Sequence, residues 1–281
     1  MTSLLSRLGL GARDRALIVT ADDFGLCHAA TEGVLDALGR GAATSAGLVV
    51  PAPWALEAAS RAGGHDVGVH LALTAGLPRF RWGPVTFAPS LLGGDGGFPA
   101  TTEDLHDHAD PDEVRRECRA QLERAVLLGV GPTHLSVLGD ALFAAPALFD
   151  VLVELAAESG LPLRLPGRAD ASRFGFPLYE LVDDAGVART DHVRHSAPGI
   201  LDDPAGFAAS LLGGVTELVV RPARDTDELH ALAPDADERV RDLGSLVGEG
   251  SIARALDDAG VVTLSWSVVR DLTPSPSVPA R

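Results

Sequence analysis

Two adjacent carboxylates and one histidine are the side chains of this sequence best placed to do chemistry. Asp22 and Asp23 follow the apolar run ALIVTA at residues 16–21, and His70 lies inside a second apolar run, VGVHLALT. A carboxylate and an imidazole at the ends of neighbouring strands make half of a divalent-metal site, and a second carboxylate can accept a proton. Taken singly, the aspartates could equally cap a turn or helix, and the histidine could pack in the core.

A third apolar run adds two polar residues to this candidate site. The run THLSVLG, residues 133–139, carries His134 near its start, and Asp140 follows its end. His106 and His108, in LHDHAD, could also enter the site from a loop, although a charged surface loop explains them as well. Because several strand ends carry such residues together, we interpret the set as a functional site rather than as unrelated core and cap residues.

Alternating strand and helix patterns must position these residues. Short, nearly continuous apolar runs predict strands that are buried on both faces, at residues 16–21, 44–50, 66–73, 133–139, 161–166, 216–222 and 261–266. Helical patterns lie between them, the clearest at residues 111–129, with Asp110 as its N-cap. This alternation predicts a parallel α/β sheet. Because no GxGxxG follows the first strand, we expect a barrel rather than a doubly wound sheet, with its chemistry at the strand ends.

The predicted domain organisation is one barrel domain with short extensions. We expect an N-terminal arm at residues 1–15, the domain at 16–272 and a flexible tail at 273–281. Residues 76–109 interrupt the alternation with a glycine- and proline-rich segment that has no sustained period. Such a long insertion is usually functional, so we expect a lid or substrate wall there, although a plain surface excursion is the alternative.

Composition excludes several classes of function. The chain has 281 residues with a formal net charge of -16, and its 23 basic residues, all arginine, face 39 acidic ones. We therefore expect no nucleic-acid partner and no attraction to an anionic membrane surface. The apolar runs are too short to span a bilayer, the first residues lack a signal-peptide pattern, and two cysteines in unrelated segments fit a reduced compartment. We expect a cytoplasmic protein.

Several segments in order resemble one known family. TADDFGL (20–26), VGVHLALT (67–74), GPTHL (131–135), GVTELVVRPA (214–223), APDADERVRDL and GVVTLSWSVVRDL are similar to the YdjC-like carbohydrate deacetylases, which include chitooligosaccharide and hopanoid-linked deacetylases. The resemblance covers residues 16–272 and implies an irregular (β/α) barrel. It also implies a divalent metal, Mg or Zn, bound by one aspartate and two histidines, and hydrolysis of an N-acetyl group on an amino sugar.

The resemblance assigns roles to individual residues, and two positions depart from it. It implies that Asp23 and His70 bind the metal and that Asp22 is the general base. The family's T-H-x-D-S-H places its second histidine ligand where this chain has Leu138, and its V-H-P places a histidine where this chain has Arg221. Asp140 could replace the missing ligand only if the strand ends early, so metal binding is expected to be weak or absent.

Three functions remain open at this stage. The first is a metal-dependent carbohydrate deacetylase with a rearranged third ligand. The second is a non-catalytic descendant that binds a sugar-like ligand or a partner. The third is an altered hydrolase or lyase in which Arg221 serves an anionic substrate. A small carbohydrate is the expected ligand, contacted by Trp82, Phe80 and Phe24, and a homodimer is left open.

Overall fold

The computed structural model describes residues 4–77, 79–197, 199–248 and 252–272. The tail expected at residues 273–281 lies outside the described residues, and so do residues 1–3 of the expected N-terminal arm. Within the described part of the chain, no helix is both long and apolar enough to cross a membrane.

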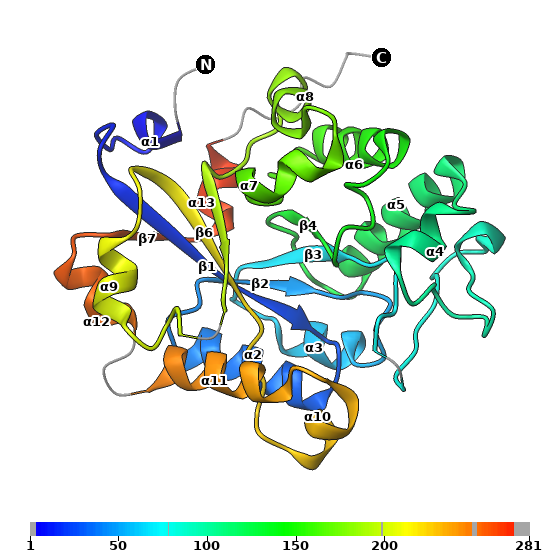
Figure 1. The fold of residues 1–281 in the computed structure, drawn as a ribbon, viewed down its shortest axis with the longest axis horizontal. Coiled ribbons are helices and arrows are strands. Elements are labelled where there is room, and N and C mark those ends of the chain that lie inside the picture. The colour runs from blue at the N-terminus through cyan, green and yellow to red at the C-terminus, as the bar shows by residue number, and fades with distance from the viewer. Residues whose placement is uncertain (1–3, 78, 198, 249–251, 273–281) are drawn as a thin grey trace.

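A single parallel sheet of seven strands curls into a half-barrel, which confirms the predicted α/β barrel class (Figure 1). The strand order is β4-β3-β2-β1-β6-β5, and β7 pairs with β1 off this path. The strands are β1 (Arg15–Phe24), β2 (Ser45–Leu48), β3 (Val67–Leu71), β4 (Leu135–Val137), β5 (His192–His195), β6 (Gly214–Val220) and β7 (Val262–Leu264).

Helices connect the strands and cover the outside of the sheet. In Figure 1, α2, α3 and α11 lie below the sheet, while α5 and α6 lie on the opposite side. The helices are α1 (Leu4–Arg7), α2 (His28–Arg40), α3 (Ala55–Arg61), α4 (Thr102–His106), α5 (Pro111–Leu127), α6 (Pro146–Ser159), α7 (Arg168–Ala171), α8 (Leu178–Asp184), α9 (Pro204–Ala209), α10 (Asp227–Leu232), α11 (Ala236–Val247), α12 (Ile252–Asp258) and α13 (Trp266–Asp271). Asp110 caps α5 as predicted, with its side chain accepting from the backbone N–H groups of Asp112 and Glu113.

Strand β1 is central, and its two ends have different neighbours. β6 pairs with β1 from Arg15 to Ala21, whereas β7 pairs only with Ala16 to Ile18 and β2 only from Thr20 onwards. Side chains on both faces of β1 are buried, as its continuous apolar run predicted. Its pairing with β2 is irregular between Ala21 and Phe24, where the two aspartates lie.

The strand predictions were wrong at two places. The run LPLRLP, residues 161–166, forms only a single bridge, between Leu163 and Leu135, because its two prolines have no N–H to continue a ladder. Strand β5 was not predicted, because three of its four residues, HVRH, are polar and none of the four is buried. The other six predicted runs contain strands.

The insertion at residues 76–109 is packed rather than irregular throughout. It contains α4 and a short 3-10 helix at Pro89–Leu91, and its Leu91, Phe98 and Leu105 are fully buried. Glu117 of α5 accepts hydrogen bonds from the backbone N–H groups of Val85 and Thr86. These contacts hold the segment against the barrel.

Candidate active site

A cavity of about 650 Å³ lies at the carboxyl ends of the strands. Asp23, His70, Leu138 and Arg221 all line it, at the strand ends where the barrel was expected to carry its chemistry. Gly76, Leu77 and Trp82 of the insertion also line it, so the insertion forms part of the cavity wall. This volume suits a small ligand such as a sugar.

An irregularity in β1 turns both aspartates toward this cavity. Successive side chains of a regular strand point to opposite faces. Asp23, however, has a φ of 64°, the only positive φ of a non-glycine residue among those described. Both Asp22 and Asp23 consequently line the cavity, and they are only 4 % and 2 % exposed. A left-handed residue at such a position is typical of functional sites.

A glycine in β2 lets polar side chains of the strands on either side of it, β1 and β3, approach each other. A Cβ on Gly47 of β2 would lie 2.8 Å from Asp22 Oδ1 and 3.2 Å from the Cβ of His70. Because glycine leaves this space free, His70 Nε2 comes within 3.8 Å of Asp22 Oδ2 across the intervening strand.

Asp22 is held by a buried arginine. Arg164 donates from Nη1 to Asp22 Oδ2 at 2.6 Å and from Nη2 to Oδ1 at 2.7 Å, and from Nε to Glu217 Oε1 at 3.1 Å. Burial alone would raise the pKa of Asp22, but the attraction of Arg164 outweighs it and lowers the pKa well below its usual range. Asp22 is therefore a fixed anion. The pKa of Glu217, in contrast, is raised by burial.

Asp23 is paired with a second buried arginine. Arg239 of α11 donates from Nη1 to Asp23 Oδ2 at 2.7 Å and from Nε to Asp235 Oδ1 at 2.9 Å. Oδ1 of Asp23 is buried and has no hydrogen-bond partner among the described residues. Such an oxygen is available to a ligand or a water.

His70 is fixed from the neighbouring strand. Its Nδ1 lies 2.8 Å from Oγ of Ser136, the residue that stands where the family pattern has aspartate. Burial lowers the pKa of His70, and the nearby Asp22 opposes this effect. The imidazole is therefore neutral at pH 7, the form in which histidine binds metals.

The donors at this end of the cavity do not complete a catalytic metal site. Asp23 and His70 supply two ligand groups, Leu138 supplies none, and Asp140 forms an ion pair with Arg173 at 2.5 Å. No group of three or more histidine, cysteine or carboxylate side chains within the described ranges could hold a metal ion. A catalytic zinc site normally has three protein ligands, so the residues present do not fit the metal that the family resemblance implies.

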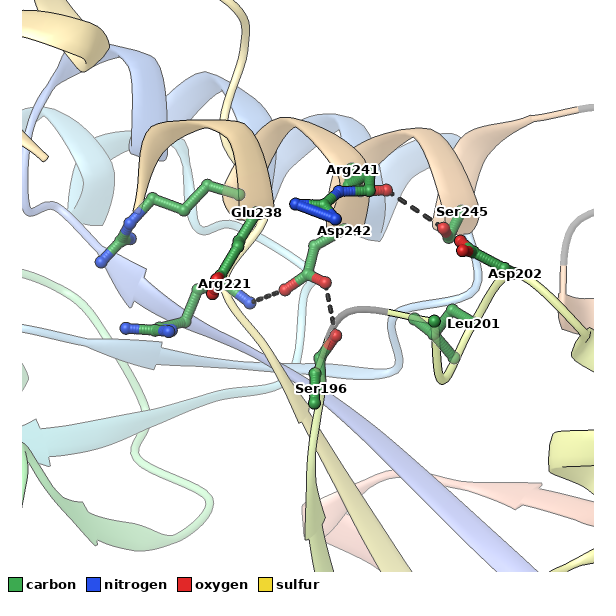
Figure 2. A pocket seen from close by; sticks show the side chains of 11 residues that line it. Ser196, Leu201, Asp202, Arg221, Glu238, Arg241, Asp242 and Ser245 are labelled. Carbon is green, nitrogen blue, oxygen red and sulfur yellow. Dashed lines mark hydrogen bonds between the residues drawn. The ribbon is translucent and has the colours of Figure 1, made fainter. Parts of the chain in front are cut away.

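The other end of the cavity carries a histidine and an arginine on the ends of β5 and β6. His195 ends β5 and is exposed, and Arg221 directly follows β6. Asp242 of α11 joins the two strand ends, because it accepts from Ser196 Oγ at 2.5 Å and from the Arg221 backbone N–H at 2.8 Å (Figure 2). Arg221 Nη1 also lies 2.8 Å from Asp235 Oδ2.

The aromatic residues expected at the substrate lie in different places. Trp82 lines the cavity, and its Nε1 has no hydrogen-bond partner among the described residues. Phe80 packs against Trp82 with a centroid separation of 6.4 Å. Phe24 is fully buried in the core and does not line the cavity, which corrects its expected substrate role. His134 is buried, stacks on Trp266 and does not line the cavity, which corrects its place in the candidate site.

Sequence reasoning missed three arginine and histidine residues of the site. Arg164 and Arg239 pair with aspartates 142 and 216 residues away in the chain, so no local spacing indicates these contacts. A charged residue inside the apolar run LPLRLP was the available signal for Arg164, because an isolated buried charge needs a partner. His195 was missed because β5 was not predicted.

Comparison with known proteins gives one family. The model of the family described as "YdjC-like protein" matches residues 16–254. A carbohydrate deacetylase of Thermus thermophilus is 36% identical over 276 residues, which cover 95% of this chain and 98% of the relative. A carbohydrate deacetylase of Brevibacillus brevis is 37% identical over 220 residues, covering 74% of this chain and 81% of the relative.

One solved structure resembles the whole fold. An Enterococcus faecalis protein, provisionally described as a cellobiose-phosphate cleavage protein, superposes with a TM-score of 0.76 at 26% sequence identity. The superposition covers 90% of this chain and 98% of the other.

Proposed function

The chain belongs to the YdjC-like family. From that premise we propose that it is a carbohydrate deacetylase, which hydrolyses an N-acetyl group on an amino sugar or oligosaccharide. The observation that carries this proposal is the convergence of Asp22, Asp23 and His70 on one cavity at the carboxyl ends of the strands. The relatives named carbohydrate deacetylase support the same reaction and substrate class.

The cavity walls favour a neutral sugar over an anionic one. Four arginines line the cavity, and each has a carboxylate partner: Arg164 pairs with Asp22, Arg173 with Asp140, Arg221 with Asp235, and Arg239 with Asp23. Each of these pairs is electrically neutral, so a substrate with a permanent negative charge gains little, although Arg221 keeps N–H donors that can bond a neutral carbonyl. The alternative of an anionic substrate held by Arg221 is therefore the weaker reading.

Trp82 and the insertion would hold the sugar ring. The indole of Trp82 lies in the cavity wall, and an aromatic face suits the apolar side of a pyranose ring. We expect chitotriose to slow hydrogen exchange in residues 79–109 while leaving α6 unchanged. Exchange in the insertion that is insensitive to the oligosaccharide would remove it from the substrate site.

Asp22 would hold the attacking water. Because Arg164 keeps its carboxylate ionised and oriented, Asp22 can accept a hydrogen bond from a water aimed at the acetyl carbon. A bound divalent metal would polarise the acetyl carbonyl. Since the donors do not form a three-ligand site, no step of the proposed reaction is assigned to a metal.

Acetate release tests this function. Purified protein incubated with N-acetylglucosamine oligomers should release acetate slowly, and Asp22→Asn should reduce the rate about 100-fold or more, because the fixed anion is lost. Asp150→Asn, on the exposed face of α6, is the matched control and should keep the wild-type rate. Absence of acetate from every oligomer, or an Asp22→Asn rate equal to wild type, would exclude the proposed activity.

A further inference from the structure

The proposed reaction needs a group that accepts and donates protons. Asp22 and His70, at the end of the cavity beside β1 and β3, do not suit this role. Asp22 is locked as an anion by Arg164, and its lowered pKa makes it a weak base. His70 is buried, and its Nδ1 is engaged by Ser136. Arg221 stands where the family pattern has a histidine, and a guanidinium does not release its proton at neutral pH.

His195 has the position and the exposure that this role requires. In the parallel ladder it pairs with Val219, and Arg221 lies two residues beyond Val219, on the same face. His195, Val219, Arg221 and Asp22 all line the cavity. His195 is exposed to the cavity, so its ring is accessible to a bound substrate and to water.

The local electrostatics keep this imidazole neutral. Partial burial and the positive charges of Arg164 and Arg221 lower the pKa of His195, while Asp22 and Asp170 act in the opposite direction. These four side chains, from β1, α7 and the segments beside β4 and β6, affect the pKa of His195 most strongly. Asp23, Asp140, Arg173 and Arg239 also line the cavity. A neutral imidazole can accept a proton at pH 7.

Asp242 fixes the relative position of the two groups. Its carboxylate accepts from Ser196, the residue after His195, and from the backbone of Arg221 (Figure 2). Asp235 orients the guanidinium by accepting from Nη1. This contact is the only ion pair of Arg221 within the described residues. The remaining guanidinium donors can point toward substrate.

We propose, on the basis of the deacetylase function above, that His195 transfers the protons of the hydrolysis and that Arg221 stabilises the oxyanion. The imidazole of His195 removes a proton from water as the water oxygen bonds to the acetyl carbon, and the carbonyl oxygen becomes an oxyanion beside Arg221. The C–N bond then breaks, and the imidazolium returns the proton to the leaving nitrogen. The products are acetate and the free amino sugar.

The pH dependence of acetate release tests the role of His195. The wild-type kcat/KM should fall on the acidic side with a midpoint below about 6.5, the ordinary histidine pKa. His195→Gln should lower kcat about 100-fold or more and remove that acidic limb. His192→Gln is the control and should keep the wild-type kcat and the acidic limb. His192 lies at the other end of β5, with its Nε2 against the Gly213 carbonyl.

Two further variants separate chemistry from structure. His195→Ala should regain part of its activity when imidazole is added, because the cavity is open at this position. Arg221→Gln should lower kcat about 100-fold, whereas Arg194→Gln, whose Nη1 binds Ser210 away from the cavity, should not. Thermal unfolding within a few degrees of wild type confirms that each variant is folded.

The outcomes distinguish the two proposals. Acetate release by the wild type, together with an unchanged rate and acidic limb in His195→Gln, would overturn the role of His195 and leave the deacetylase function standing. A His195→Gln variant in which only KM changes would also overturn the role of His195. A wild-type protein that releases no acetate would overturn both.

Discussion

The two halves of the cavity differ in how their charged groups are held. On the side of β1 to β4, Asp22 and Asp23 are almost completely buried and each is paired with a buried arginine. On the side of β5 and β6, His195 is exposed and the side chain of Arg221 is 46% exposed. The buried half keeps the motif residues Asp22, Asp23 and His70, whereas in the other half the motif is broken at Arg221, and His195, the accessible proton carrier, lies outside the motifs. Recognisable sequence and available chemistry are therefore separable within one site.

Removing Arg164 should produce the largest effect and would show that the buried half is held together by its ion pairs. Arg164→Met leaves Asp22 and Glu217 buried without their cation, so we expect a loss of about 3–5 kcal/mol in the free energy of unfolding, measured with urea. Arg119→Met removes an exposed pair with Glu158 and should cost less than about 1 kcal/mol. Equal losses would show that the buried ion pairs of this half contribute no more to stability than an exposed pair.

Filling the space at Gly47 should disturb the buried half alone. In Gly47→Ala the new Cβ meets Asp22 Oδ1 at 2.8 Å, so we expect about 1–3 kcal/mol of destabilisation and slower acetate release. Gly39→Ala is the control, because a Cβ there meets nothing within 4 Å and alanine favours the helix α2. A wild-type rate in Gly47→Ala would mean that the approach of Asp22 to His70 is not needed.

Restoring the missing imidazole should change the metal content of the buried half. We expect substoichiometric metal in the wild-type protein after dialysis, and Leu138→His should raise its zinc affinity more than about tenfold. Leu127→His, at the exposed end of α5, controls for an added surface histidine. Full metal occupancy of the unmodified protein, measured by elemental analysis, would show that another residue completes the site.

The smallest effect is expected at an ion pair remote from both halves. Hydrogen bonds from Arg224 lower the pKa of Asp36 to about 2, so its stabilising contribution is present above about pH 4 and is lost as the pH falls through about 2. Asp36→Asn should cost under about 1 kcal/mol at pH 7 and only a small part of that near pH 2, as measured by urea unfolding. A cost that grows on acidification would contradict this sign.

The sequence predicted the part of the fold that depends on local patterns. Apolar runs located β1, β3 and β6, and the shared edge of a parallel sheet then placed Asp23, His70 and Arg221 at one rim. Sequence could not predict β5, because HVRH has no apolar periodicity and is stabilised by pairing with β6. Nor could it predict the pairing of Arg239 with Asp23, because that contact joins α11 to β1 across almost the whole chain.

The divided neighbourhood of β1 has a consequence for synthesis of the protein on the ribosome. The first half of β1 pairs with β6 and β7, whose residues begin at Gly214 and Val262. At about 5–20 residues per second, roughly 200 residues must be translated first, so this apolar strand waits on the order of 10–40 s for its partners. During that time its backbone groups are an open template for other chains. Protection of the nascent chain against aggregation should therefore depend on chaperones until translation passes Leu264.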